Sequence, residues 1–206
     1  MLDRRITAWI KPGVDQLARA AARLGLSANT LSLIGFLLGL LAALFIACKR
    51  YEIGLGLILV SRLFDALDGA VARLDQATDR GGFLDISLDF LFYASIPLAF
   101  AWASPGQNAL PAAGLLAAFM GTSTSFLAFA IFAAKRQMLS QAYPSKSFYF
   151  LGGLTEATET LLFFAAMCLW PSHFPVLAYC FAALCVVTIA SRLIWGWKAF
   201  SDRPSA

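Results

Sequence analysis

Hydrophobic positions along the chain gather into six long runs separated by short polar breaks. The runs cover roughly residues 30–48, 53–73, 83–103, 109–134, 150–170 and 175–197. An α-helix needs about 20 apolar residues to cross the hydrocarbon core of a bilayer. The pattern therefore predicts an all-α, polytopic membrane protein whose six transmembrane helices form one bundle over residues 30–197. No internal repeat divides the chain, so we expect residues 1–206 to be a single domain.

A different pattern precedes the first run. Apolar residues recur there at steps of three and four, with basic residues between them: Leu2, Ile6, Trp9, Ile10, Val14, Leu17, Ala21 and Leu24. This spacing is typical of an amphipathic helix, and the basic residues suit an anionic membrane surface. We expect residues 1–26 to lie on that surface as an anchor, with Pro12 as a point where the helix can bend.

Composition narrows the class of protein. Hydrophobic residues make up 60% of the chain and charged residues 14%, whereas soluble domains average about 45–50% and about 25%. This excludes a soluble enzyme, a disordered chain and a secreted disulfide scaffold. The formal net charge of +4 is better interpreted as a topology signal than as a nucleic-acid footprint, and no nucleic-acid partner is expected.

Basic residues indicate how the runs are oriented. Thirteen of the 16 fall on one side of the predicted membrane: Arg4, Arg5, Lys11, Arg19, Arg23, Arg73, Arg80, Lys135, Arg136, Lys146, Arg192, Lys198 and Arg203. The opposite side carries only Lys49 and Arg50, and Arg62 lies inside the second run. Because positive loops stay in the cytoplasm, we expect a multi-pass protein of the cell (inner) membrane with both termini cytoplasmic.

Acidic residues concentrate in one part of the chain. Seven of the 12 lie in Glu52–Asp89, and four of these have helical spacing: Asp65, Asp68, Asp85 and Asp89. The two members of each pair diverge by about 60° and about 40°, so each pair shares one helix face. A short polar loop joins the two runs, which predicts antiparallel, adjacent helices. At about 1.5 Å per residue, all four carboxylates then lie at a similar shallow depth on the cytoplasmic side.

Four carboxylates in a medium of low dielectric constant need compensating charge. Arg62 could offset one of them, and two divalent cations would offset all four. An all-oxygen set without Cys or His favours Mg²⁺, with Mn²⁺ or Ca²⁺ as alternatives, over Zn²⁺. Because Mg²⁺ held by carboxylates completes its shell with water and substrate phosphates, the cluster predicts phosphate chemistry at a membrane face.

The residues around these carboxylates form a longer motif. The motif begins with Asp65-Ala-Leu-Asp68-Gly69-Ala-Val-Ala72-Arg73. A spacer of seven residues follows, and the motif ends with Gly81-Gly-Phe-Leu-Asp85-Ile-Ser-Leu-Asp89. This resembles the signature of the CDP-alcohol phosphotransferases, DxxDGxxAR followed by GxxxDxxxD, at all of its fixed positions. Residues 27–33 also resemble the start of that family's first span, with Ala28 in place of a proline and Ser in place of two threonines. The resemblance extends over about residues 25–195.

The resemblance implies an enzyme of phospholipid biosynthesis. It would transfer a phosphatidyl or related group from a CDP-linked donor, such as CDP-diacylglycerol, to the hydroxyl of a small alcohol or polyol and release CMP. It implies that two divalent cations are held by Asp65, Asp68, Asp85 and Asp89. Asp89 would also act as the general base on the acceptor hydroxyl.

The resemblance also implies a nucleotide site. Gly69 would let the nucleotide approach the backbone, Arg73 would bind the diphosphate, and Asn29 would border the site. Ala72 and Gly81 belong to the same motif. A spacer residue is expected to contact the nucleotide phosphates, and counting from either end of the spacer gives Thr78 or Asp79; we favour Thr78. Family members tend to be homodimers, although Gly35 and Gly39 in the first run favour helix packing within the chain.

The acceptor stays open at this point. Glu156 and Glu159 share a helix face, and they either pair with Lys146 or Arg192 or line a pocket for a cationic amino-alcohol or a polyol. The basic residues Lys135, Arg136, Lys146 and Arg192 could instead bind a phosphorylated acceptor.

Two other classes of protein share some of these features. An intramembrane prenyltransferase also grips a diphosphate through Mg²⁺ and aspartates, but it needs more spans and widely separated motifs. A cation transporter or a non-catalytic cation-binding protein is the other alternative. A shallow, one-sided acidic cluster offers a poor conduction path, which makes this reading the weaker one.

Overall fold

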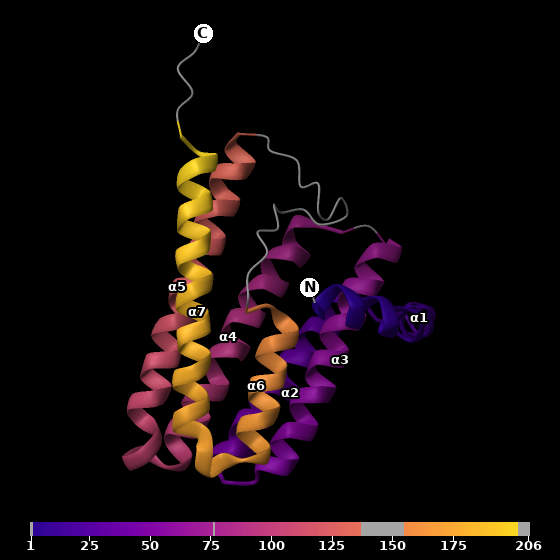
Figure 1. Ribbon diagram of the computed structural model, residues 1–206. Coiled ribbons are helices and arrows are strands. Elements are labelled where there is room, and N and C mark those ends of the chain that lie inside the picture. The colour runs from indigo at the N-terminus through magenta and orange to yellow at the C-terminus, as the bar shows by residue number, and fades with distance from the viewer. Residues whose placement is uncertain (1, 76, 137–154, 202–206) are drawn as a thin grey trace.

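The computed structural model describes residues 2–75, 77–136 and 155–201, with side chains from Lys11 onward (Figure 1). All regular structure in these residues is helical, which confirms the predicted all-α class. The elements in chain order are α1 (Leu2–Arg23), α2 (Ala28–Ala47), α3 (Tyr51–Asp75), α4 (Asp79–Ala103), α5 (Pro105–Lys135), α6 (Ala157–Leu169), the 3₁₀ turn η1 (Pro171–His173) and α7 (Phe174–Ala199).

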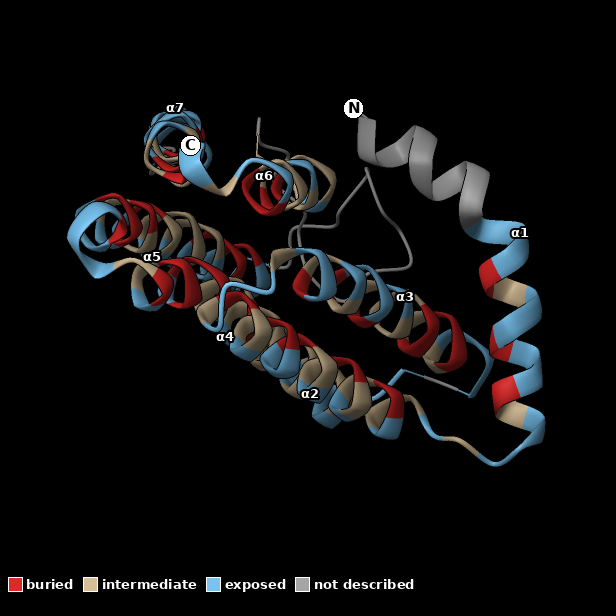
Figure 2. Cartoon of the chain, turned by 90° about the horizontal axis from the view of Figure 1, so that it is seen from below, coloured by how far each residue is buried: buried red, intermediate tan, exposed pale blue. Residues whose placement is uncertain are grey.

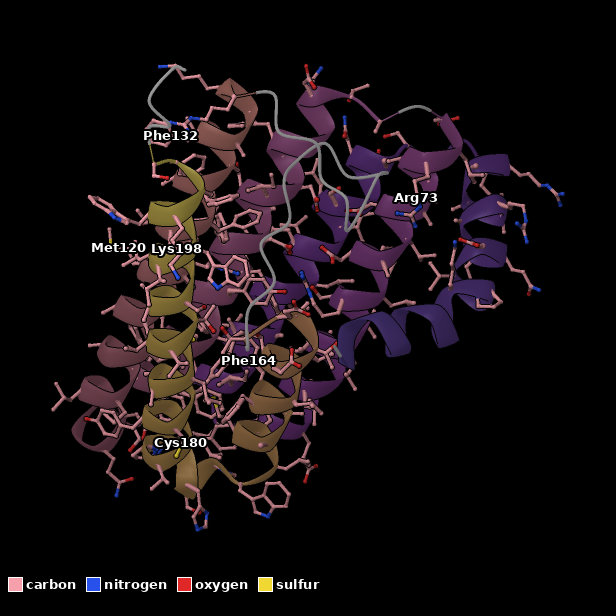
Figure 3. All side chains as sticks on the ribbon, turned by 45° about the horizontal axis from the view of Figure 1, so that its top comes forward. Arg73, Met120, Phe132, Phe164, Cys180 and Lys198 are labelled. Atoms are coloured by element: carbon pink, nitrogen blue, oxygen red, sulfur yellow. The ribbon has the colours of Figure 1, made fainter. Side chains whose placement is uncertain are left out.

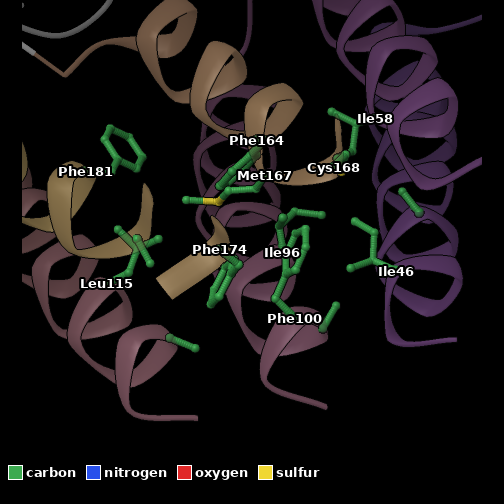
Figure 4. Close-up of a cluster of buried hydrophobic side chains, with 14 of the residues drawn as sticks. Ile46, Ile58, Ile96, Phe100, Leu115, Phe164, Met167, Cys168, Phe174 and Phe181 are labelled. Atoms are coloured by element: carbon green, nitrogen blue, oxygen red, sulfur yellow. The ribbon is translucent and has the colours of Figure 1, made fainter. Parts of the chain in front are cut away.

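Helices α2 to α7 run alongside one another, and α1 lies outside this bundle against α3 (Figures 1 and 2). Helix α2 packs against α3 and α4, while α5 packs against α4 and α7. Figure 3 places Arg73 near the end of α3 and Phe164 on α6, among the other helices. The main core is aromatic, with Phe92, Phe100, Phe164, Phe174 and Phe181 fully buried. Figure 4 shows the last four of these among aliphatic side chains such as Ile96 and Leu115.

Four helices are long and apolar enough to cross a membrane by length and composition: α2, α4, α5 and the combined Pro171–Ala199. Helix α3 is as long as α4, at 25 residues, but it carries six charged side chains along its length. Helix α6 has 13 residues, which span about 20 Å, and residues 150–154 of the predicted fifth run lie outside the described part. The expected set of six spans is therefore not confirmed.

The predicted N-terminal helix forms, but its apolar positions divide between two environments. Val14, Ala18 and Ala21 are buried in a small second core with Leu67, Ala70 and Val71 of α3 and Leu31 of α2. Leu17 and Leu24, expected on the same face, are exposed. Part of the apolar stripe thus serves packing against α3, and contact of α1 with a membrane surface stays a prediction.

A four-residue turn connects α1 to α2. Gly25 has a φ of 75°, the left-handed conformation that suits glycine. Its N–H bonds the carbonyl of Ala22 at 3.0 Å, and the N–H of Leu26 bonds that of Ala21 at 3.1 Å. Ser27 then caps α2, since its Oγ accepts a hydrogen bond from the N–H of Thr30 at 3.2 Å. Both helix ends are therefore satisfied within the turn.

Helices α3 and α4 meet through side chains more than through their backbones. Both pack closely on α2, whereas the contact between them is made by pairs such as Arg62 and Asp89. The cause is visible at two glycines of α2. A Cβ on Gly35 would lie 3.0 Å from Cβ of Phe64 in α3, and one on Gly39 would lie 2.4 Å from the Phe92 ring of α4. Because these two glycines have no side chain, both α3 and α4 can approach α2 closely, and side chains fill the space between α3 and α4.

Replacing Gly39 by alanine should destabilise the bundle. Phe92 is 1% exposed, so its ring has no open space into which to move, and overpacking of this kind costs about 1–3 kcal/mol. We expect the thermal unfolding midpoint of the detergent-solubilised Gly39→Ala variant to fall.

The matched control is Gly56→Ala in α3. A Cβ there meets nothing within 4 Å, and alanine in a helix interior stabilises by roughly 0.5–1 kcal/mol over glycine. An unchanged midpoint for Gly39→Ala would contradict the close approach of α2 and α4.

Candidate active site

Three aspartates from two helices meet at the centre of the site. Asp65 and Asp68 lie one turn apart on α3, and Asp85 lies in the second turn of α4. One carboxylate oxygen from each of them falls within 4.8 Å of the others. The helical spacing expected from the sequence thus brings this triad together, although the two backbones are separated.

The triad fits a hard divalent cation. Asp68 is only 5% exposed, and among the described residues its buried Oδ2 has no hydrogen-bond partner. An orphaned buried carboxylate oxygen costs free energy, and a bound cation would satisfy it. Three convergent carboxylates provide the oxygen ligands that Mg²⁺ and Mn²⁺ prefer. The donor set therefore suits a metal ion.

The fourth aspartate is held differently. Asp89 follows Asp85 by one turn of α4 and lines the same small cavity. Its Oδ1 accepts a hydrogen bond from Nη1 of Arg62 at 2.7 Å, and the same nitrogen lies 3.4 Å from Oδ1 of Asp65. The structure thus brings all four predicted carboxylates to one cavity, three as a convergent triad and one in an ion pair.

The aspartates of the cavity come from the C-terminal half of α3 and the N-terminal half of α4, the two ends that the α3–α4 loop joins. The remaining lining comes from Ser32, Gly35 and Phe36 of α2 and from Leu88 of α4. Placement near this loop agrees with the common depth expected for the four carboxylates. The cytoplasmic orientation of this end stays a prediction.

Three of the expected nucleotide residues meet at the start of α4. A Cβ on Gly81 would lie 3.2 Å from both Oδ1 of Asn29 and Oγ1 of Thr78. Thr78 is the N-cap of α4, and its Oγ1 accepts the N–H of Gly81 at 3.1 Å. Its hydroxyl hydrogen can still be donated. Asp79, the alternative spacer residue, is an exposed residue of the first turn.

The other expected nucleotide residues lie on the last turns of α3. A Cβ on Gly69 would lie 3.5 Å from Nη1 of Arg73, an ordinary van der Waals distance, so the guanidinium lies over Gly69. Arg73 is exposed near the end of α3 (Figure 3), and Ala72 beside it is half-buried. Gly69 directly follows Asp68, so this group starts at the edge of the carboxylate triad.

A second, larger cavity of about 220 Å³ is also lined by α4. Phe90 and Tyr93, from the turn that follows Asp89, form one wall. The polar lining consists of Thr122, Ser123, Thr155, Glu156, Thr160 and Arg192. Nη1 of Arg192 donates to the carbonyl of Thr122 at 3.0 Å, and its buried Nε has no partner among the described residues. The cavity therefore offers a cationic donor next to several hydroxyls.

The two glutamates of α6 have separate roles. Glu156 is the N-cap residue, and its N–H donates to Oε2 of Glu159 at 3.2 Å in a capping box. Glu159 thus closes the helix end, while Glu156 lines the second cavity together with Arg192. Lys146, an alternative partner in the sequence analysis, lies outside the described residues.

Sequence reasoning found Glu156 and Arg192 but missed Thr122, Ser123 and Thr160. Single hydroxyl residues inside apolar helices are common and carry no motif. Only the packing of α4, α5, α6 and α7 brings them to one cavity.

Comparisons with known proteins match most of the chain. The CDP-alcohol phosphatidyltransferase family matches residues 26–194. The inner membrane protein YnjF of Escherichia coli (strain K12) is 51% identical over 197 residues, 96% of this chain and 96% of that protein. The archaetidylinositol phosphate synthase of Pyrococcus horikoshii is 39% identical over 94 residues, 45% of this chain and 50% of that enzyme.

Solved structures of one enzyme share the fold. The phosphatidylinositol phosphate synthase of Mycobacterium tuberculosis with CDP-DAG bound gives a TM-score of 0.74 at 20% identity, covering 94% of this chain and 98% of that one. Its complex with manganese and citrate gives 0.69 at 22% identity, covering 93% of each chain.

Removing one carboxylate of the triad should weaken metal binding. We expect Asp68→Asn to lower the affinity of the purified chain for Mn²⁺ by about tenfold or more, since even outer-shell changes at metal sites cost about 10–100-fold. Calorimetric titration with Mn²⁺ measures this. Asp75→Asn, at the exposed end of α3, should leave the affinity unchanged, and equal losses in both variants would point away from the triad.

Proposed function

The chain belongs to the CDP-alcohol phosphatidyltransferase family, and we propose that it transfers a phosphatidyl group from CDP-diacylglycerol to a hydroxyl of a polyol or polyol phosphate. It is a membrane transferase of phospholipid biosynthesis that releases CMP. The observation that carries the proposal is the convergence of the motif aspartates on one cavity, with an orphaned carboxylate oxygen among them.

Two features support a CDP-lipid donor. The Mycobacterium tuberculosis enzyme of the same fold has CDP-DAG bound. In this chain, Asn29, Thr78 and Gly81 gather at the start of α4, and Gly69 and Arg73 follow the triad on α3. A helix start, a free hydroxyl and an exposed guanidinium are suitable partners for a diphosphate. We assign these residues, with Ala72 between Gly69 and Arg73, to the nucleotide site.

The aspartates would hold the metal ions. Asp65, Asp68 and Asp85 would bind one ion, and Asp89 would join Asp65 at a second, with Mg²⁺ as the first choice and Mn²⁺ as the alternative. The manganese complex of the Mycobacterium tuberculosis enzyme supports this choice of ions. When bound, the ions polarise the donor diphosphate and stabilise the charge of the departing CMP.

The transfer itself exchanges one phosphorus–oxygen bond for another. The acceptor oxygen attacks the phosphorus that carries the lipid, and the bond from that phosphorus to the CMP oxygen breaks. CMP leaves with the electron pair of that bond. Asp89 takes the proton from the acceptor hydroxyl as general base. Its position between the carboxylate cavity and the Phe90–Tyr93 wall of the second cavity suits this role.

We assign the acceptor to the cavity of about 220 Å³ beside Asp89. Its hydroxyl residues can exchange hydrogen bonds with a polyol. The partnerless Nε of Arg192 is a buried donor that an acceptor phosphate would satisfy. The unpaired Nε of Arg192 therefore favours a polyol phosphate as the acceptor. A cationic amino-alcohol is the alternative, because the carboxylate of Glu156 in the same cavity would attract it.

The same proposal includes the membrane arrangement. Helices α3 and α6 would cross the bilayer within the bundle, which brings the total to the six predicted spans. Both termini and the site would face the cytoplasm of the cell (inner) membrane, with α1 on its surface, all within one domain. We also expect a homodimer, as the family resemblance implies.

Loss of the general base should abolish turnover. With CDP-diacylglycerol, Mg²⁺ and a panel of polyols and their phosphates, the purified protein should release CMP. Asp89→Asn should lower that rate by about 10²–10⁴-fold, whereas Asp79→Asn, an exposed residue of α4, should not. Metal-dependent ion flux without CMP release would instead indicate a transporter, and pyrophosphate release from a prenyl diphosphate would indicate a prenyltransferase.

The acceptor assignment has its own test. Arg192→Gln should raise the KM for a polyol phosphate by about tenfold or more, because a charged hydrogen bond contributes about 1.5–3 kcal/mol. The KM for CDP-diacylglycerol should stay unchanged. Arg136→Gln is the matched control, since Arg136 bonds the carbonyls of Ala199 and Phe200 at the end of α7. A larger effect of Glu156→Gln on an amino-alcohol would favour that acceptor instead.

A further inference from the structure

Arg62 has two carboxylate partners at the edge of the triad. Its Nη1 lies 2.7 Å from Oδ1 of Asp89 and 3.4 Å from Oδ1 of Asp65. Its side chain is only 14% exposed. One nitrogen therefore stands between an oxygen of α3 and an oxygen of α4.

The surroundings of Arg62 hold it in this place. Its guanidinium lies 4.0 Å from the centre of the Phe92 ring, a cation–π contact. Nη2 donates to Oγ of Ser61 at 3.3 Å, and that hydroxyl donates to the carbonyl of Gly35 at 2.7 Å. Three helices thus contribute to its position. A surface arginine that met the carboxylates by chance would have no such support.

We propose that Arg62 acts as an internal cation in the place of the second divalent ion. This rests on the metal site proposed above. An ion shared by Asp65 and Asp89 needs the space between their oxygens, and Nη1 of Arg62 stands there. The chain without substrate therefore binds one divalent ion at Asp65, Asp68 and Asp85. A second ion binds only when Arg62 moves away from Asp89.

Charge balance identifies the ligand that permits this move. Four carboxylates with Arg62 carry three net negative charges, and one divalent ion reduces these to one. A second ion would leave one positive charge in excess as long as the Arg62 guanidinium stays near the carboxylates, which is unfavourable in a site of low dielectric constant. A nucleoside diphosphate brings the missing negative charge. The second ion and the CDP moiety should therefore bind together, and Arg62 makes the site respond to the donor.

Metal stoichiometry tests this without measuring turnover. The full chain in detergent is titrated with Mn²⁺, and free Mn²⁺ is followed by electron paramagnetic resonance, with and without CDP, which carries no group to transfer. We expect one Mn²⁺ per wild-type chain without CDP and two with it. Arg62→Met, which keeps the bulk and loses the charge, should bind two without CDP. Arg62→Lys, which keeps a charge, should bind one.

Each result decides a separate point. Two Mn²⁺ per wild-type chain without CDP, or one both with and without it, would overturn the role of Arg62 whether or not the variants fold. One Mn²⁺ in Arg62→Met without CDP would do the same. Absence of Mn²⁺ binding to any chain would refute the metal site itself. CMP release by the wild-type chain would show that the transferase assignment survives a failure confined to Arg62.

Discussion

The cost of placing negative charge inside a helical bundle shapes this part of the molecule. Asp65, Asp68, Asp85 and Asp89 face one small cavity, where partial burial weakens the screening of their mutual repulsion by water. Among the described residues that line this cavity, one is a cation, Arg62, held by Phe92 and Ser61. The remaining charge is left for a ligand to neutralise. The four carboxylates therefore suit a bound cation, and without one their mutual repulsion destabilises this part of the fold.

Small residues make that arrangement sterically available. Gly35 and Gly39 let α3 and α4 both approach α2 closely, so that the carboxylates of the two helices converge beside α2. Gly35 also lines the cavity, where a side chain would crowd it. Thr78 and Gly81 begin α4 with a side-chain cap that places Asn29 alongside. The close approach of the α2, α3 and α4 backbones at these few positions thus determines where the four carboxylates meet.

Sequence reasoning predicted the features that depend on local spacing. The helical class, the short α3–α4 loop and the shared faces of each aspartate pair all follow from residues close together in the chain. It missed features that depend on which helices touch. The close packing of both α3 and α4 on α2, through glycines of α2, was not predicted. The capping box between Glu156 and Glu159 was not predicted, although the pocket expected for these residues does include Glu156. The hydroxyl residues of α5 in the second cavity left no signal in the sequence.

The packing of α1 links the outside of the molecule to its interior. Val14, Ala18 and Ala21 rest on Leu67, Ala70 and Val71, the residues of α3 that flank Asp68 on the side away from the cavity. The four-residue turn then carries the chain directly to Asn29. A shortened protein that begins at α2 would expose Leu67, Ala70 and Val71 to solvent, directly beside the buried Asp68. Deletion of α1 should therefore disturb the site from behind, although α1 contributes no residue to it.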